Sequence, residues 1–560
     1  MRQTSSPSAW PTAPAGALLA LVSLNLVNLA CDGDLSKAEP PSTTHLVAGD
    51  VRLVGDGVTS CSHQPLSARG SADRWCAFTV GEKIGTPATL WVLNVTKART
   101  AKVVCDGTSP HCLRLTSELW TGEPPFAPSH PYVHGFYGDS LFFYTGPVVE
   151  DEAFTGVIHG WRPGMAGPVA LTGDKGIFCF GHERVAAAGC LSNQVSPGPT
   201  ESIEFDLQAG PIQTMPGVAG VLPVLERVRP FEPDGSLTWG AQFSPTGEYF
   251  AFATKVDDMV TPRGQRPVVR LRAVPTAQLG LAAPTEVVRG LQEWSFSPDG
   301  RKLFFLRRPA TGTSSLMAAD FPGGGAAPVE LATGVRRFEV YGEVGGPLLG
   351  LGLFIPTGDS LTTFRLLRDL DNPASSLTVA EGVENMQVSP DLRYSFFQDS
   401  AGADNARSLI VRNDGSGRLC PLTRNAGQFS FSVRFLPNQR VLFSEDAVVT
   451  DRTSLDQPIE GWIASSEDCG EAQRYSSNLA YTRPTPGGLL YGEQDKGVFT
   501  MSMHHVPFLP SGQLALDKVS HFAMGADYTS ALLDEKLFVY TVPDGPETTN
   551  AGLFVHGPLP

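Results

Sequence analysis

The most regular pattern in the sequence is a pair of short apolar runs separated by a tight polar turn. Residues 294–296 alternate between apolar and polar side chains, Ser-Pro-Asp-Gly follows at 297–300, and residues 303–306 are apolar at every position. Proline presets φ for the first central position of a turn, Asp hydrogen-bonds its own backbone, and Gly accepts positive φ. The pattern predicts a strand, a turn and a second strand that is buried on both faces.

This turn phrase returns along the chain with a regular spacing. From Pro298 to Pro390 is 92 residues, or two periods of 46, and the neighbouring intervals are 47 and 53 residues. A copy without the phrase is expected near residue 344, where a glycine-rich turn separates residues 337–341 from 348–354. The turn positions of the copies are Pro245, Gly247, Pro298, Asp299, Gly300, Pro390, Asp391, Pro437 and Asn438. We interpret these residues as structural, including the two aspartates.

Each turn is followed by two further short apolar segments, such as 314–320 and 329–332. Four short strands per period form the blade of a β-propeller, so we predict an all-β propeller of four-stranded antiparallel blades. About ten candidate units, and at least eight, lie between residue 45 and residue 560. One large ring is favoured, and the alternative is two smaller rings that meet near residues 221–236.

The phrase F-S-P-D-G-x-x-L-x-F at 296–305 resembles the WD40-like repeat of the TolB propeller family, chiefly over residues 237–450. The resemblance implies a propeller of the bacterial cell envelope that acts as a binding scaffold. It covers the repeats alone, because we expect neither the α/β domain that precedes the propeller in TolB nor the hydrolase domain that follows it in prolyl-oligopeptidase-type enzymes.

The first 30 residues have the character of a signal peptide. Arg2 precedes a mainly apolar stretch at 15–30, and Leu29-Ala30-Cys31 resembles a bacterial lipoprotein cleavage site, although Asn28 stands where that site prefers Leu. We predict that Cys31 carries the lipid and that residues 31–44 form a flexible tether to the membrane. The alternatives are ordinary cleaved secretion and a buried N-terminal helix.

The remaining eight cysteines agree with export, because an even number in an oxidising compartment indicates disulfides. Nearness in sequence favours the pairs Cys61–Cys76, Cys105–Cys112 and Cys179–Cys190, which leaves Cys420 with Cys469. The last two are 49 residues apart, close to one period, so this pair could join neighbouring blades. The alternative is a set of free, buried thiols.

Composition agrees with a turn-rich β protein and excludes one class of partner. The chain of 560 residues contains 59 Gly and 46 Pro, and its net charge is −15. Without clustered Lys and Arg, a nucleic acid partner is not expected. The partners that we expect are an unidentified envelope protein or polymer, and the membrane through the N-terminal lipid.

No motif for catalysis, a cofactor or a metal is present. The chain lacks G-x-S-x-G, the phosphate-binding G-x-x-x-x-G-K-[ST] and H-E-x-x-H. His504 and His505 are adjacent, but on a strand their rings would point to opposite faces, which disfavours joint metal binding. We therefore predict a non-catalytic scaffold. The alternative is a glycan hydrolase or lyase, which requires several carboxylates or histidines to converge at the mouth of the channel.

Overall fold

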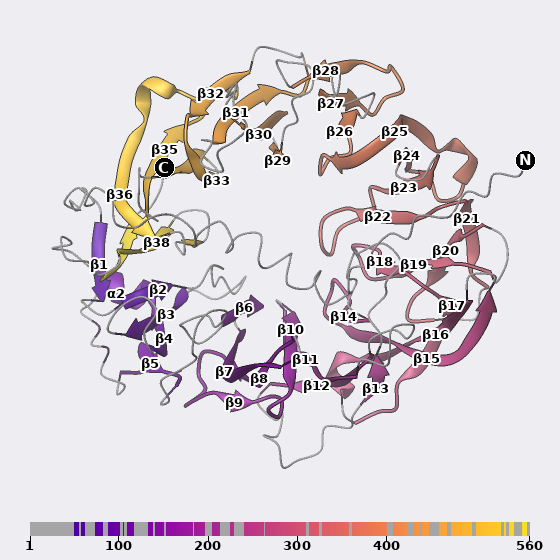
Figure 1. The fold of residues 1–560 in the computed structure, drawn as a ribbon, viewed down its shortest axis with the longest axis horizontal. Helices are drawn as coiled ribbons and strands as arrows, with labels where there is room; N and C mark the ends of the chain where they lie inside the picture. The colour runs from indigo at the N-terminus through magenta and orange to yellow at the C-terminus, as the bar shows by residue number, and fades with distance from the viewer. Residues whose placement is uncertain are drawn as a thin grey trace, which may run out of the picture.

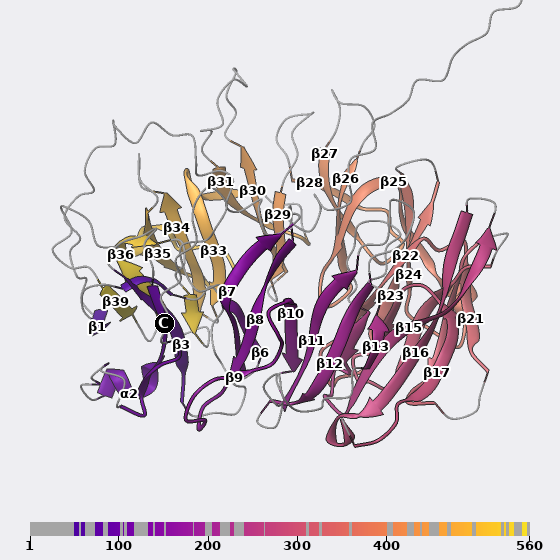
Figure 2. The same cartoon turned by 60° about the horizontal axis from the view of Figure 1, so that its bottom comes forward.

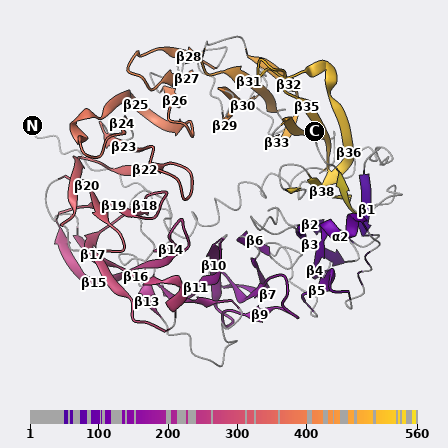
Figure 3. The ribbon, with the colours of Figure 1, turned by 180° about the vertical axis from the view of Figure 1, so that it is seen from behind.

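The computed structural model describes most of residues 50–556, and its longest gaps are at 62–72, 117–132, 196–203, 213–224, 229–239, 423–430, 447–458 and 543–551. Groups of antiparallel strands follow one another around a single closed ring (Figure 1), and the view from behind shows the same order (Figure 3). The chain is therefore one β-propeller, as predicted, and the two-ring alternative is wrong. The signal segment 1–30, Cys31 and the tether lie outside the described residues.

Eight groups of the ring consist of four consecutive strands each. In the first half of the chain they are β2 (Val58–Cys61), β3 (Trp75–Gly81), β4 (Ala88–Asn94) and β5 (Cys112–Arg114); β6 (Val133–Tyr137), β7 (Ser140–Glu150), β8 (Ala153–Trp161) and β9 (Val169–Ala170); β10 (Gly176–His182), β11 (Val185–Val195), β12 (Glu204–Pro211) and β13 (Leu225–Val228); and β14 (Ala241–Phe243), β15 (Tyr249–Thr261), β16 (Gly264–Pro275) and β17 (Thr285–Leu291).

In the second half they are β18 (Trp294–Phe296), β19 (Lys302–Arg307), β20 (Ser315–Asp320) and β21 (Val329–Thr333); β22 (Arg337–Tyr341), β23 (Gly350–Pro356), β24 (Thr362–Leu367) and β25 (Leu377–Val388); β29 (Phe431–Leu436), β30 (Arg440–Asp446), β31 (Ile459–Ser465) and β32 (Gln473–Ser476); and β33 (Leu479–Thr485), β34 (Gly488–Gln494), β35 (Thr500–Pro507) and β36 (Ser520–Asp527). The described helical segments are short: α2 (Val95–Thr100), η2 (Thr276–Gln278), η3 (Pro373–Ser375) and η4 (Leu516–Lys518).

Two further groups are completed by a strand from elsewhere. β26 (Tyr394–Asp399), β27 (Arg407–Arg412) and β28 (Leu419–Pro421) join the second half of β25, whose first half pairs with β24. Gly382 lies between the two halves with φ +67°, a conformation that favours glycine. β37 (Ala531–Leu533), β38 (Leu537–Val542) and β39 (Gly552–His556) are completed by β1 (Asp50–Val54), which pairs with β39. The two ends of the described chain thus close the ring within one sheet.

The segment 221–236, predicted as a possible internal boundary, contains β13. This strand hydrogen-bonds β12 on one side and β15 on the other, so that the groups from β6 to β17 form one continuous twelve-stranded sheet. The tilted view shows these groups standing side by side along the wall of the ring (Figure 2). The ring therefore continues through β13, the described part of this segment.

The core lies between neighbouring blades, and β19 shows why its sequence is apolar at consecutive positions. All four residues from Leu303 to Leu306 are fully buried. Leu303 and Phe305 pack against β15, β16 and β17, whereas Phe304 and Leu306 pack against β22 and β23. Both faces of this strand are covered by a neighbouring blade, and burying each such side chain stabilises the fold by about 1.5–3 kcal/mol.

Candidate functional site: a cluster of turns

The recurring turn is held by one serine and one aspartate. The Ser297 hydroxyl lies 2.6 Å from Asp299 Oδ1 and accepts a hydrogen bond of 2.8 Å from the Lys302 N–H. Asp299 Oδ1 also accepts from the Arg301 N–H at 3.1 Å. The same contacts recur in the turn that follows β25, where Ser389 and Asp391 take these places. The aspartates are therefore structural, as predicted.

Two opposing effects act on the Asp299 carboxyl. Partial burial raises its pKa, but hydrogen bonds from Ser297 and from the Arg301 N–H, together with the charge of Arg301, lower the pKa below its ordinary value. The carboxylate therefore stays ionised at neutral pH and accepts hydrogen bonds within the turn. The carboxylate is thus engaged in holding the loop.

The residue that ends each turn adopts positive φ. The value is +76° at Gly247 and +71° at Gly300, but the corresponding positions in later copies are Leu392, at +59°, and Gln439, at +60°. The two non-glycine residues keep the turn although a side chain disfavours this conformation. Pro437 and Asn438 of the last copy lie outside the described residues. The predicted copy near residue 344 is confirmed as the hairpin of β22 and β23.

Turns of four consecutive blades touch one another. The His182 ring, beside the β10–β11 turn, lies 3.1 Å from the Pro245 carbonyl, and a Cβ at Gly300 would lie 3.3 Å from the Thr246 hydroxyl. The Gly345 N–H, in the β22–β23 turn, donates to the Pro298 carbonyl at 2.8 Å. Since each turn joins the first strand of its blade to the second, all four lie at the same end of the ring. We call them the turn cluster, comprising the described residues 182, 184–185, 244–249, 297–302 and 342–349.

The first and fourth turns of the cluster also meet. A Cβ at Gly345 would lie 3.4 Å from both terminal nitrogens of Arg184, so the arginine reaches past the two intervening turns. β10, β14, β18 and β22, which lead into these turns, lie together on the inner side of the ring (Figure 1). Each of the four turns therefore contacts two others of the set, and together they form a continuous surface beside the centre of the ring.

The surface of the turn cluster combines apolar and charged side chains. Val344 is 55% exposed and Leu349 is 39% exposed, both in the β22–β23 turn. Arg184 and Glu343 are also exposed. Apolar side chains with flanking charges are a combination that protein-binding surfaces use. No sequence pattern points to Arg184 or Val344, because their proximity depends on the packing of separate blades.

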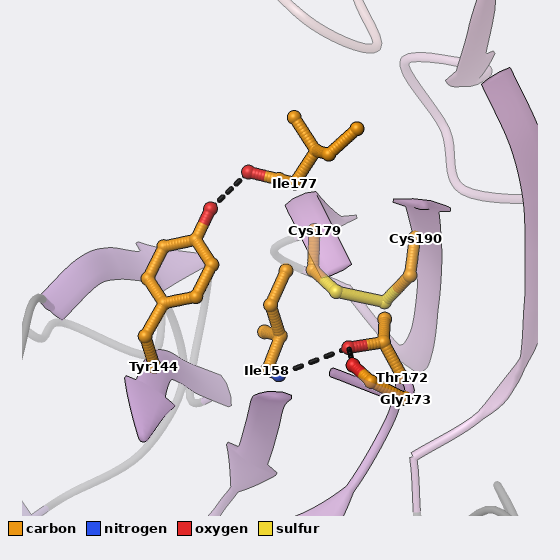
Figure 4. Close-up of a disulfide and its surroundings, with 7 residues drawn as sticks. All are labelled: Tyr144, Ile158, Thr172, Gly173, Ile177, Cys179 and Cys190. Carbon is orange, nitrogen blue, oxygen red and sulfur yellow. Dashed lines mark hydrogen bonds between the residues drawn. A yellow bond between two sulfur atoms is a disulfide. The ribbon is translucent and has the colours of Figure 1, made fainter. Parts of the chain in front are cut away.

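The structure tests several of the predicted cysteine pairs. Cys105–Cys112 and Cys179–Cys190 are disulfides, as predicted. The second joins register partners on β10 and β11 and lies among buried side chains of two blades (Figure 4). In the same figure Tyr144 donates to the Ile177 carbonyl, and the Ile158 N–H donates to Thr172 at 2.9 Å. These bridges are compatible with an oxidising compartment.

The predicted Cys61–Cys76 disulfide is wrong, because Cys76 is a free, buried thiol. The register aligns Cys61 with Phe78, two residues beyond Cys76, so the two cysteines are not register partners. Cys420, on β28, is disulfide-bonded. Its predicted partner Cys469 lies outside the described residues, so that pairing stays a prediction.

The adjacent histidines of β35 face opposite sides, as predicted. His504 stacks on Tyr491, whereas His505 contacts Thr485. Within the part of the chain that the structure describes, no three His, Cys, Asp or Glu side chains are placed to hold a metal ion. In the same part, no helix is both long and apolar enough to cross a membrane.

The sequence matches no protein-family profile, and no curated protein is significantly similar to it. Similar solved structures include the eukaryotic initiation factor, with a TM-score of 0.44 at 10% identity over 81% of this chain and 96% of that one. They also include a putative TolB from Agrobacterium tumefaciens, with a TM-score of 0.25 at 17% identity over 42% and 79%. The β-propeller domain of the Trilobed protease from Pyrococcus furiosus gives 0.29 at 8% over 60% and 94%. TolB is among these neighbours, as the repeat predicts, and the likeness concerns the fold alone.

Proposed function

We propose that this chain is a non-catalytic, envelope-anchored propeller that binds a partner protein or an envelope polymer through the turn cluster. The observation that carries the proposal is the closed set of contacts between the four turns, which joins loops of four blades into one surface. The contacts are His182–Pro245, Thr246–Gly300, Pro298–Gly345 and Gly345–Arg184. Loops that a rigid scaffold positions are common sites of binding.

Several features of the cluster support binding rather than chemistry. The carboxylate of Asp299 is occupied by hydrogen bonds within its own turn. The exposed side chains of the β22–β23 turn include the apolar Val344 and Leu349, which offer contact area, and one carboxylate, that of Glu343, which a second carboxylate of the same turn does not accompany. Binding at this surface would require little rearrangement, because hydrogen bonds already fix the turns.

The proposed location is the cell envelope, with Cys31 as the lipid-bearing residue. The two disulfides support an oxidising compartment, and the Leu-Ala-Cys sequence before Asp32 supports lipidation. A lipid on the first mature residue, followed by the tether, would leave the propeller free to present the turn cluster at a distance from the membrane.

A paired experiment tests binding and anchoring separately. Affinity purification from the envelope of the source cell would compare the wild type with Val344→Asp, and with Val329→Asp as control because Val329 is 60% exposed but lies on β21, outside the cluster. We expect a partner that Val344→Asp loses and Val329→Asp keeps. Equal retention by both variants would contradict the proposed surface. Cys31→Ala should move the protein from the membrane to the soluble fraction, and unchanged fractionation would contradict the anchor alone.

A further inference from the structure

The blade formed by β33–β36 carries a histidine on each of its two faces. The register pairs His504 with Tyr491 and with His521, and it pairs His505 with Leu490 and with Ser520. Tyr491 belongs to the apolar cluster shared with the preceding blade, β29–β32. Leu490 belongs to the cluster shared with the closing blade, β37–β39. His504 and His505 therefore lie at the two interfaces that this blade makes with its neighbours. We call the interface with β29–β32 the first joint and the interface with β37–β39 the second joint.

At the first joint, two imidazole rings share one hydrogen bond. His504 Nδ1 and His521 Nδ1 are 2.6 Å apart. One nitrogen must donate and the other must accept, so at least one ring has to remain neutral. If both rings were protonated, two N–H groups and two positive charges would face each other at this distance. The contact is therefore compatible with one charge on the pair but not with two.

An aromatic ring and a carboxylate also lie beside His504, and the carboxylate can balance positive charge on the histidine pair. On β34, Tyr491 stacks on the ring at 4.9 Å and Glu493 Oε2 lies 3.8 Å from Nε2. Glu493 in turn accepts from the Ser476 hydroxyl at 2.7 Å and from the Ser477 N–H at 3.2 Å, both from the preceding blade. The Glu493 carboxylate can balance one imidazolium, and the same carboxylate ties the blade to its neighbour.

At the second joint, His505 is buried beside the closing blade. Its Nε2 lies 3.3 Å from the Thr485 hydroxyl on β33, and Ser520 on β36 donates to its carbonyl at 3.2 Å. Its titratable neighbour on the closing blade is His556, the last residue of β39, which the register aligns with Asp50 of β1. Burial lowers the pKa of His505, and the positive charge of His556 lowers it further. The neutral form is thus the one that fits this joint.

We propose that the β33–β36 blade is an acid-sensitive joint of the ring, in which protonation of the His504–His521 pair and of His505 loosens the packing against the preceding blade and the closing blade. The effect would centre on the part of the ring where β1 completes the sheet of β37–β39. It is independent of the proposed function, because the turn cluster belongs to other blades.

The direction of the pH effect follows from linkage. A histidine whose pKa is lowered in the folded state contributes stability that is fully present above the unfolded value of about 6.5 and is lost as pH falls below it. At the first joint, a second proton on the His504–His521 pair would turn the accepting nitrogen into a donor and so break the hydrogen bond between the two rings. Each unit by which folding lowers a pKa corresponds to about a tenfold change in the opening equilibrium of the blade.

Hydrogen–deuterium exchange of the full chain, followed by mass spectrometry at about pH 7.5 and about pH 5, tests the proposal without any substitution. After correction for intrinsic exchange, we expect protection of β33–β36 and of β37–β39 to fall by about tenfold or more relative to β18–β21. An equal change in all blades, or no change in any, would overturn the proposal.

Substitutions assign the effect to the histidines. The double variant combines His521→Gln, which removes one ring of the pair at the first joint, with His505→Gln, which removes the buried ring at the second joint. This variant should lose the acid response. His159→Gln is the control, because the half-buried His159 ring contacts the Thr145 hydroxyl, much as His505 contacts Thr485, but it lies on β8 in another blade. This control should keep the full response. An acid response that persists unchanged in the double variant would refute the role of these residues.

Discussion

The Gly345 N–H donates a hydrogen bond of 2.8 Å to the Pro298 carbonyl, which joins the turns of two neighbouring blades. Pro298 belongs to the clearest copy of the Ser-Pro-Asp-Gly turn. Gly345 belongs to the β22–β23 turn, which occupies the same place in its blade but does not have that sequence. The contact shows that the turns shape their own hairpins and also pack against each other. The turn cluster is thus part of the fold as well as the surface proposed for binding.

Gly342→Ala should destabilise the protein strongly. Gly342 has φ +150°, and a Cβ there would lie 2.6 Å from both Pro298 Cγ and the Pro347 carbonyl oxygen. Backbone strain and the clash together should lower the free energy of unfolding by about 2–4 kcal/mol. Urea denaturation would measure it. In the control, Gly290→Ala, φ is +78° with no atom within 4 Å, and the cost should be only about 1 kcal/mol. Equal effects of the two changes would contradict the packing of the turns.

Asp299→Asn should reduce stability at neutral pH by about 1–2 kcal/mol, because the carboxylate accepts two hydrogen bonds that the amide holds less well. The pKa of Asp299 is lowered in the folded state. Its stabilising effect is therefore present above the unfolded value of about 3.9 and is lost as pH falls through the folded value.

Denaturation of both proteins at several pH values would check this dependence. The difference between wild type and Asp299→Asn should narrow below about pH 4. Asp320→Asn serves as control, since Asp320 is an exposed partner of Lys302 at 3.1 Å and should change stability by less than about 0.5 kcal/mol. A difference that stays constant with pH would show that the charge of Asp299 is irrelevant to the turn.

Leu392→Gly tests which of two opposing effects dominates. Glycine would relieve the strain of φ +59°, which is worth about 1 kcal/mol. However, Leu392 is only 2% exposed, and removing a buried leucine side chain costs about 3–5 kcal/mol. We expect a net loss of about 2–4 kcal/mol in the free energy of unfolding. A stabilised variant would indicate that strain outweighs burial at this turn.

Cys76 should remain unmodified in the folded protein. Burial raises the pKa of its thiol to about 12, so almost no thiolate forms at neutral pH, and the side chain is only 5% exposed. Iodoacetamide should label Cys76 only after unfolding, as peptide mass spectrometry without reduction would show. Detection of a Cys61–Cys76 disulfide in the same spectra would contradict the structure.

The repeat made most of the fold predictable, because the residues that specify a turn, and the alternation of apolar and polar residues in a strand, lie close together in the sequence. Pro298, Asp299 and Gly300 specify a hairpin in any context, and the consecutive apolar residues of β19 already indicate coverage on both faces. The closure of the ring by β1, the sharing of β25 between two groups and the contact of Arg184 with Gly345 depend on which blades become neighbours. No local pattern encodes these relationships.

The cysteines show the same division. Two pairs close in sequence are predicted correctly, since the β10–β11 hairpin brings Cys179 to Cys190 and only seven positions separate Cys105 from Cys112 at the start of β5. Nearness in sequence failed for Cys76, where the register of β2 and β3 places Phe78 opposite Cys61. The spacing of cysteines along the sequence does not reveal a register shift of two residues. Such a shift is enough to decide whether two cysteines can form a disulfide.

Site-specific photo-cross-linking in the source cell tests binding at the turn cluster most directly. A photoreactive phenylalanine analogue would replace Val344 in one variant and Val329 in another, since both side chains are exposed but only Val344 lies in the cluster. We predict a discrete adduct of one defined mass from position 344 and none from position 329. Adducts of the same pattern from both positions, or from position 329 alone, would contradict binding through the turn cluster.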